Sequence, residues 1–182
     1  MDWETTRDEP FKKLRFVQKS GIVSVKDFFT DPKNIFLAHE MISQLDGATV
    51  TKFTVQYNLF GGSMTALHTE RHAHFFDKID SGEVIGCFCL TELGFGNNAI
   101  KMETTVTYDD MTQEFIVNSP TVMSQKYWIT NGFKHSNWAL VFGQTIVKGK
   151  NEGVAAFLVQ IRDKNMKEMP GVQIIDMGLK IG

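Results

Sequence analysis

An aromatic pair beside a hydroxyl and a glycine turn is the segment of this sequence best suited to hold a flat ring. The segment reads Tyr127-Trp-Ile-Thr-Asn-Gly132. An aromatic face can stack on a conjugated ring, and a hydroxyl can hydrogen-bond to polar atoms at the edge of that ring. Trp128 and Thr130 therefore indicate a site for a conjugated cofactor, with packing in an apolar core as the simpler alternative.

A second segment places a hydroxyl at the end of an apolar run and two glycines shortly after it. Thr91 ends the run, and Gly94-Phe-Gly96-Asn-Asn-Ala99 loosely resembles the G-x-G-x-x-A fingerprint of a dinucleotide site. That fingerprint requires a helix directly after it, because the helix N-terminus holds the pyrophosphate. A Thr-rich strand pattern follows here, which excludes a Rossmann assignment. The backbone N–H groups of a glycine turn could still bind a phosphate or flavin oxygen.

The histidines and cysteines are weaker candidates for chemistry. His68, His72 and His74 include an i,i+4 pair, a spacing that can share a metal ion on a helix. No carboxylate stands at the spacing of a known site type, so we expect no metal site. Cys87 and Cys89 lie one residue apart in an apolar run, which favours buried thiols and a reducing compartment.

Composition excludes several classes of protein. The 182 residues are 42% hydrophobic and 22% charged, which fits one globular domain or two small ones and excludes disorder, collagen and coiled coil. The formal charge of -2 leaves no basic excess for a nucleic-acid surface. No apolar run reaches the roughly 18–20 residues of a membrane span. The acidic N-terminus lacks the apolar region of a secretory signal.

Helical patterns occupy the first part of the chain. Asp31-Pro32 is a typical helix start, and apolar residues then recur at helical spacing as far as Gly47. A second helix is predicted over 49–60, interrupted by Gly61-Gly62. A third is predicted from there to the break at Ser81-Gly82.

Strand patterns occupy the rest, so the fold class is α+β. Residues 1–82 are predicted to form a helical segment, and residues 83–182 an antiparallel β-barrel or sandwich domain. Because 170–182 reads as a strand and turn leading onward, we expect a partial or truncated chain with an incomplete β-domain. The predicted strands are 84–91, 101–108, 113–118, 126–130, 137–147 and 154–161, with turns at 109–112 and 148–153.

The chain resembles the acyl-CoA oxidases, the peroxisomal branch of the acyl-CoA dehydrogenase superfamily. The resemblance covers nearly all of the chain and is densest over 56–182. The order and spacing of several motifs carry it. They are Gly86-Cys-Phe-Cys-Leu-Thr-Glu-Leu-Gly-Phe-Gly96, Glu103-Thr-Thr-Val-Thr-Tyr-Asp109, Gln113-Glu-Phe-Ile116, Asn118-Ser-Pro-Thr121, Lys126-Tyr-Trp-Ile-Thr130, Ala156-Phe-Leu-Val-Gln-Ile-Arg162 and Pro170-Gly-Val172 through Met177-Gly178.

The resemblance implies an FAD site between this middle β-domain and helical domains. Thr91 and Thr130 would contact the flavin, and Trp128 would lie against its ring. Gly94 and Gly96 would bring backbone amides close to the cofactor. One position departs from the family pattern: Asn97 stands where relatives commonly carry Ser or Thr.

The resemblance also implies a reaction, a compartment and partners. The reaction is α,β-desaturation of a fatty acyl-CoA to a trans-2-enoyl-CoA, with O2 reduced to H2O2, in the peroxisome and by a homodimer. The family's catalytic base is a glutamate of a C-terminal helical domain that is absent from this sequence. Glu92, Glu103 and Glu114 do not match it, so no catalytic residue is expected here. The isolated chain is expected to be inactive and either to self-associate or to be marginally stable, because apolar side chains that include Phe36, Phe60, Phe75 and Phe76 would lack their packing partners.

Two alternatives remain at this stage. One is an acyl-CoA dehydrogenase that passes electrons to a flavoprotein. The oxidase is favoured because Thr91-Glu-Leu-Gly-Phe-Gly96 resembles the oxidase form rather than the Thr-Glu-Pro-x-Ala-Gly-Ser form of dehydrogenases. The other is a non-catalytic remnant that acts as a binding or dimerising module, favoured by the missing base and the missing half of the cofactor site.

Overall fold

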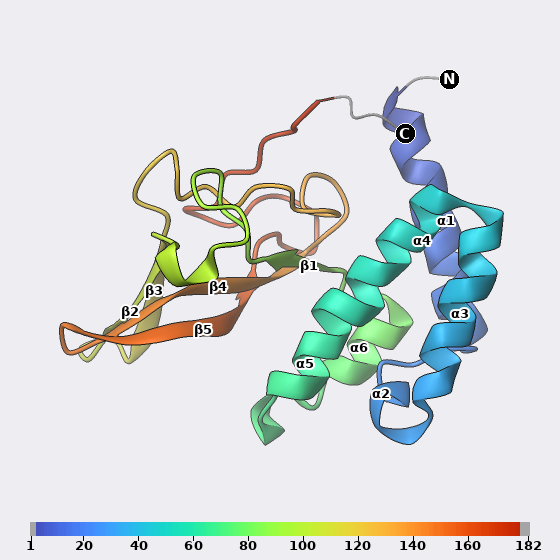
Figure 1. Ribbon diagram of the computed structural model, residues 1–182, viewed down its shortest axis with the longest axis horizontal. Helices are drawn as coiled ribbons and strands as arrows, with labels where there is room; N and C mark the ends of the chain where they lie inside the picture. The colour runs from blue at the N-terminus through green and yellow to red at the C-terminus, as the bar shows by residue number, and fades with distance from the viewer. Residues whose placement is uncertain (1–2, 179–182) are drawn as a thin grey trace. The chain divides into compact units, whose positions relative to one another are not determined.

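The computed structural model describes residues 3–178, with helices first and strands after them (Figure 1). The described chain divides into two compact units. The helical unit contains residues 3–87, 130–138 and 160–178, and the strand unit contains 88–129 and 139–159. The mixed helix-and-strand class is confirmed. The domain boundary near residue 82 stays a prediction.

Packing of α1 and α3 against α4 builds the helical unit (Figure 1). The fully buried side chains include Leu14, Phe53 and Phe60. Within residues 3–178, no helix is long and apolar enough to cross a membrane. The helices of this unit are α1 (Trp3–Ser20), α2 (Asp27–Thr30), α3 (Pro32–Leu45), α4 (Gly47–Phe53), the π-helix η1 (Thr54–Gly61), α5 (Gly62–Leu67), the 3-10 helix η2 (Glu70–His72) and α6 (Phe75–Ser81), and the strand unit has the 3-10 helix η3 (Ala99–Lys101).

The predicted interruption at Gly61-Gly62 is wrong, because helical backbone continues through both glycines from α4 to α5. A Cβ at Gly61 would lie 2.6 Å from Val25 Cγ1, and one at Gly62 would lie 3.1 Å from Phe28 Cζ. The glycines therefore permit close packing of the 25–28 segment instead of ending the helix. The helix ends at Leu67, because His68 is extended (φ -65°, ψ 157°), so the predicted third helix is broken.

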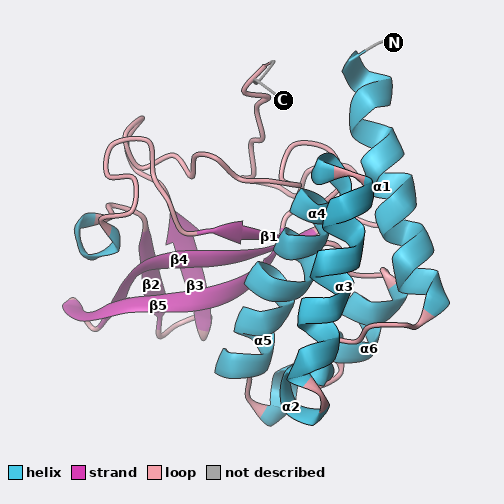
Figure 2. Cartoon of the chain, turned by 45° about the vertical axis from the view of Figure 1, so that its right-hand side comes forward, coloured by secondary structure: helices cyan, strands magenta, loops and turns pink. Residues whose placement is uncertain are grey.

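The strands form one curled sheet with the order β1-β4-β2-β3, and β5 also pairs with β4 (Figure 2). The predicted hairpin is confirmed, because β2 pairs antiparallel with β3 from Thr105↔Asn118 to Asp109↔Glu114. The strands are β1 (Gly86–Cys89), β2 (Thr105–Asp109), β3 (Glu114–Asn118), β4 (Trp138–Val147) and β5 (Lys150–Gln160).

Two details of the sheet differ from the sequence-based expectation. Strands β2 and β4 run parallel, and the long segment 119–137 supplies the connection that parallel neighbours need. The last turn is shorter than 148–153, since β5 begins at Lys150. Lys148 and Gly149 both have positive φ (50° and 77°), as in the two-residue turns that suit the twist of a hairpin.

Most of the phenylalanines expected to lack partners belong to the core. Phe60, Phe75 and Phe76 are 0%, 8% and 7% exposed, because they pack within the helical unit. The expectation of exposed surface is wrong for these three, whereas Phe36 on α3 is 74% exposed. Self-association of the chain stays a prediction.

The contact between Gly61 and Val25 gives a direct test of the glycine's role. We expect Gly61→Ala to lower the free energy of unfolding by about 1–3 kcal/mol, because the added methyl group overpacks the site. Gly47→Ala is the matched control, since nothing lies within 4 Å of a Cβ there and alanine favours helix. Urea unfolding of both variants measures the difference. Equal stability of the two would contradict the packing role.

Candidate functional site

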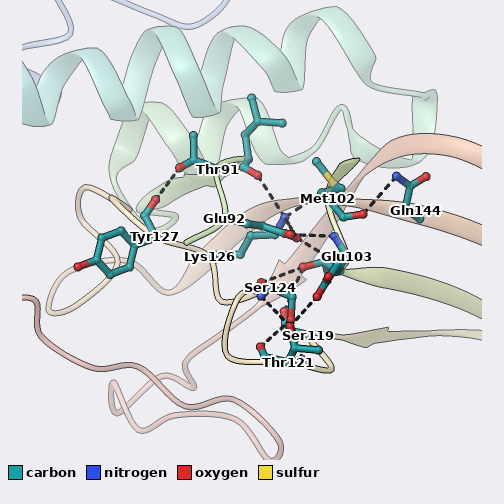
Figure 3. A network of polar contacts seen from close by, with 12 residues as sticks. Thr91, Glu92, Met102, Glu103, Ser119, Thr121, Ser124, Lys126, Tyr127 and Gln144 are labelled. Atoms are coloured by element: carbon teal, nitrogen blue, oxygen red, sulfur yellow. Dashed lines mark hydrogen bonds and ion pairs between the residues drawn. The ribbon is translucent and has the colours of Figure 1, made fainter. Parts of the chain in front are cut away.

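Hydrogen bonds join the two segments that sequence analysis singled out (Figure 3). The Thr91 hydroxyl donates to the Tyr127 carbonyl oxygen at 2.5 Å, and the Tyr127 N–H donates to the Thr91 carbonyl oxygen at 3.0 Å. The Leu93 N–H donates to the Gln125 carbonyl oxygen at 3.0 Å. The structure therefore brings the Thr91 segment and the segment before Trp128 side by side.

The two glycines that follow Thr91 shape a tight turn. The Gly94 N–H donates to the Met123 carbonyl oxygen at 2.9 Å, and the Gly96 N–H donates to the Glu92 carbonyl oxygen at 2.8 Å. A Cβ at Gly94 would lie 2.8 Å from Met123 Cβ, and Gly96 has φ +53°. Both positions thus need glycine for close approach or backbone conformation. Their amides already have partners within the chain.

Beneath this pair of segments lies a buried carboxylate that sequence analysis did not single out as an anchor (Figure 3). Glu92 is 2% exposed. Its carboxylate accepts hydrogen bonds from Glu103 N (2.8 Å), Thr104 N (2.9 Å) and Lys126 Nζ (3.1 Å). Burial favours a raised pKa for Glu92, but the hydrogen bonds from Thr104, Glu103 and Lys126 outweigh it and the pKa lies below its ordinary value. The carboxylate therefore stays ionised and fixed.

Hydroxyl groups extend this network into the loop before Lys126 (Figure 3). Thr104 Oγ1 lies 3.1 Å from Ser119 Oγ and donates to the Ser124 carbonyl oxygen at 3.2 Å. The Thr121 hydroxyl donates to Glu103 Oε2 at 2.6 Å. The irregular loop thereby gains partners for its polar groups and a defined path toward Trp128.

The predicted strand over 126–130 is wrong. Lys126 makes an isolated bridge to Glu92, and Trp128 then has φ +63°. This left-handed conformation is rare and strained for a bulky aromatic residue. Trp128 is 64% exposed. An exposed aromatic face held by strained backbone is a candidate ligand platform.

The five predicted site residues fall in different units. Thr130 belongs to the helical unit. The other four belong to the strand unit, namely Thr91, Gly94, Gly96 and Trp128. Thr130 is exposed and begins a turn. The carbonyl oxygen of Asn131, the next residue, closes this turn by accepting from His135 N (3.2 Å) and Ser136 N (3.0 Å).

Charged side chains distant in the sequence surround this turn. Lys52 Nζ donates to Asn131 Oδ1 at 3.2 Å and lies 3.3 Å from His135 Nδ1. His135 Nε2 lies 3.0 Å from Asp8 Oδ1, and the Phe11 ring stacks on the imidazole at 4.1 Å between centroids. Sequence analysis missed this cluster, because Lys52 stands 79 and 83 positions from its partners and no local pattern links them.

Buried Arg162 holds the same turn from the chain's last segment. Its guanidinium donates to the carbonyl oxygens of Gly132 (2.8 Å), Ser136 (2.6 Å) and Phe133. The charge of the guanidinium strengthens these hydrogen bonds relative to those of a neutral donor. One side chain thus satisfies three backbone carbonyl groups of the turn.

The surroundings of His135 determine the protonation state of its imidazole. Burial, with Lys52 beside the ring, lowers the pKa of His135 to about 4. Burial also lowers the pKa of Lys52 to about 8, with the charge of Arg7 adding to the effect. A neutral imidazole then donates from Nε2 to Asp8 and accepts at Nδ1 from the Lys52 ammonium group.

The histidines considered for metal binding have other partners. His68 Nδ1 lies 2.8 Å from the Thr65 carbonyl oxygen, and His72 Nδ1 lies 3.1 Å from Thr69 Oγ1. The ring of His74 lies against that of Phe75. Among residues 3–178, no group of three or more His, Cys, Asp or Glu residues is arranged to hold a metal ion.

Comparisons with known sequences point to one group of enzymes, although no family model matches the chain. Acyl-coenzyme A oxidase 2, peroxisomal, of Arabidopsis thaliana is 37% identical over 177 residues, which cover 93% of this chain and 26% of that protein. Peroxisomal acyl-coenzyme A oxidase 3 of Homo sapiens is 34% identical over 181 residues, covering 98% and 26%. The chain therefore spans about a quarter of the length of these curated relatives.

Solved structures agree with the sequence relatives. The crystal structure of acyl-CoA oxidase 1 from Yarrowia lipolytica matches with a TM-score of 0.88 and 28% identity, over 99% of this chain and 26% of that chain. Acyl-CoA oxidase-2 of Caenorhabditis elegans, bound with FAD, ascaroside-CoA and ATP, matches with a TM-score of 0.68 and 26% identity, over 96% and 30%.

The buried ion pair predicts a large effect of one isosteric change. We expect Glu92→Gln to lower the free energy of unfolding by about 3–5 kcal/mol, because it leaves Lys126 buried without its counter-charge. Glu152→Gln is the control, since its pair with Lys150 is exposed and such pairs contribute about 0–1 kcal/mol. Urea unfolding compares them. A similar small loss in both variants would disprove the anchoring role.

The buried imidazole predicts a pH dependence of stability. Above pH ~6.5 His135 is neutral in the folded and unfolded chain. Between ~6.5 and about 4 only the unfolded chain binds the proton, so stability falls as pH falls, by up to about 3 kcal/mol. Unfolding at pH 7 and pH 4.5 measures the slope. His135→Gln should flatten it and exposed His74→Gln should not; equal slopes in the two variants would contradict the assignment.

Proposed function

We propose that this chain, which belongs to the acyl-CoA oxidase family, supplies part of the flavin-binding surface of an acyl-CoA oxidase. The observation that carries the proposal is the exposed, left-handed Trp128 next to the bonded Thr91 and Tyr127. Strained backbone persists where the surrounding structure enforces it, and it concentrates at functional sites.

The proposed reaction is that of the family. It is FAD-dependent α,β-desaturation of a fatty acyl-CoA to a trans-2-enoyl-CoA with O2 reduced to H2O2. We propose the peroxisome as its location and a homodimer as the working assembly. Relatives named peroxisomal acyl-CoA oxidases support the substrate class and the compartment, and the Caenorhabditis elegans structure bound with FAD and ascaroside-CoA supports the cofactor and the substrate class.

The residues present fit a flat, conjugated group. The Trp128 ring offers an exposed face for stacking. The Thr91 hydroxyl gives its proton to the Tyr127 carbonyl oxygen, so its remaining lone pairs can accept a hydrogen bond from a ligand N–H. In the helical unit, Thr130 offers an exposed hydroxyl of its own. When bound, FAD supplies the two-electron redox chemistry of the reaction.

The glycines and the buried ion pair have supporting roles in this proposal. The amides of Gly94 and Gly96 are engaged within the chain, so we assign these glycines to close approach of the turn to the cofactor. Glu92 is assigned no part in proton transfer, because Glu103, Thr104 and Lys126 occupy its carboxylate. No residue of this chain is proposed as the catalytic base.

The variant Trp128→Gly tests whether the Trp128 side chain binds a ligand or stabilises the fold. In the protein that carries this sequence we expect FAD affinity to fall on the order of tenfold, because the stacking face is lost. The free energy of unfolding should change by less than about 1 kcal/mol, since relief of the backbone strain offsets the entropy cost of glycine. Flavin fluorescence titration and urea unfolding measure the two quantities.

Met166→Gly is the matched control, because Met166 is also left-handed (φ +62°) and 42% exposed but lies in neither segment. Its FAD affinity should match that of the unchanged protein. Thr91→Val should weaken FAD binding, whereas exposed Thr112→Val should not. A stability loss of ~3–5 kcal/mol in Trp128→Gly with unchanged FAD affinity would refute the site, because a core tryptophan behaves in that way.

A further inference from the structure

The turn that follows Thr130 is irregular backbone with a demanding conformation. Asn131 has φ +68°, is 7% exposed, and closes the turn through its carbonyl oxygen. Asparagine tolerates the left-handed region better than most residues but gains no hydrogen bond from it alone. Whatever fixes Asn131 also fixes the direction in which the chain leaves Thr130.

Lys52 on α4 is the side chain that fixes Asn131. Its ammonium group donates to Asn131 Oδ1 at 3.2 Å and reaches His135 Nδ1 at 3.3 Å, so it holds both ends of the turn. His135 is in turn held by Asp8 at Nε2 and by the stacked Phe11 ring. Hydrogen bonds from a charged donor are stronger than neutral ones, and more so when partly buried.

Lys134 offers a natural contrast within the same turn. It bonds to the same carboxylate of Asp8, at 2.9 Å, but its side chain is 35% exposed. The hydrogen bonds found for its ammonium group within residues 3–178 end at Asp8 and do not reach Asn131. Mutation of Lys134 therefore removes a positive charge near Asp8 without removing a contact to Asn131, whereas mutation of Lys52 removes that contact.

We propose that Lys52 is a positioning residue that acts through Asn131 and His135 to hold the turn 130–136 in the conformation that presents the Thr130 hydroxyl. The proposal rests on the proposed function, in which Thr130 contacts the flavin. It extends the site to a helix residue 79 positions from Asn131 in the sequence.

The test measures the turn and the cofactor separately, in the full protein that carries this sequence. In Lys52→Met we expect the amides of His135 and Ser136 to exchange hydrogen about tenfold faster, the change expected from one lost charge-assisted hydrogen bond. FAD affinity should fall severalfold and the visible flavin absorption should shift, as in Thr130→Val. Lys134→Met should change exchange and affinity less than twofold.

Asn131→Gly tests whether Lys52 acts through this side chain. Glycine accepts the left-handed backbone but removes the amide, so it should reproduce the faster exchange of Lys52→Met. The double variant should be no worse than the stronger single variant, because each change already removes the Lys52–Asn131 hydrogen bond. If Lys52→Met does not fold, two other variants replace it. Asn131→Gly removes the contact and should speed exchange of the turn amides, whereas Lys52→Arg keeps a charged donor and should leave exchange closer to that of the unchanged protein.

Results of two kinds would overturn the proposal, one on the turn and one on the cofactor. The first is unchanged exchange of the turn amides in Lys52→Met, or additive effects in the double variant. The second is faster exchange with unchanged FAD affinity and absorption while Thr130→Val alters both. If Thr130→Val itself has no effect on FAD, the proposed flavin contact of Thr130 fails, and the exchange and coupling data alone decide whether Lys52 holds the turn.

Discussion

The buried pair between Glu92 and Lys126 is the interaction on which the candidate site in the strand unit depends. An ion taken out of water costs several kcal/mol unless partners compensate it, and Glu92 meets that cost with two backbone N–H groups and one ammonium group. Glu92 directly follows Thr91, and Lys126 directly precedes Tyr127. A slip of either segment would strand a buried charge, so desolvation holds the Thr91–Tyr127 hydrogen bonds in register.

In the helical unit, charged side chains hold the irregular turn after Thr130. Their hydrogen bonds replace the regular backbone hydrogen bonds of a helix or sheet. Arg162 binds three carbonyl oxygens of the turn after Thr130, while Lys52 binds the side chains of Asn131 and His135. Segments outside helices and sheets lack a regular set of partners for their polar groups, and each buried group must find one. Side-chain charges supply those partners here, which gives loops the rigidity that a binding site requires.

Sequence patterns predicted the elements whose structure is set by neighbouring residues. They failed where contacts between residues far apart in the sequence set the structure. Pro32 at the start of α3 and the 105–118 hairpin follow from capping and turn chemistry, and the structure has both. Gly61 is required by its close approach to Val25, 36 positions earlier, and the composition of 126–130 gives no sign of the left-handed Trp128. The Lys52 cluster left no local signal, whereas the hydroxyl and aromatic of the candidate site did.

The conformation of Trp128 follows from the pair that precedes it. In a regular strand, side chains alternate between faces, and the ring would continue that alternation. Lys126 is held by Glu92 and Tyr127 by Thr91, so the chain enters residue 128 from a fixed position. One left-handed residue then redirects the backbone, and Trp128 is 64% exposed. We infer that the Glu92–Lys126 pair and the Thr91–Tyr127 hydrogen bonds help to keep Trp128 in this conformation, because they fix the two residues before it.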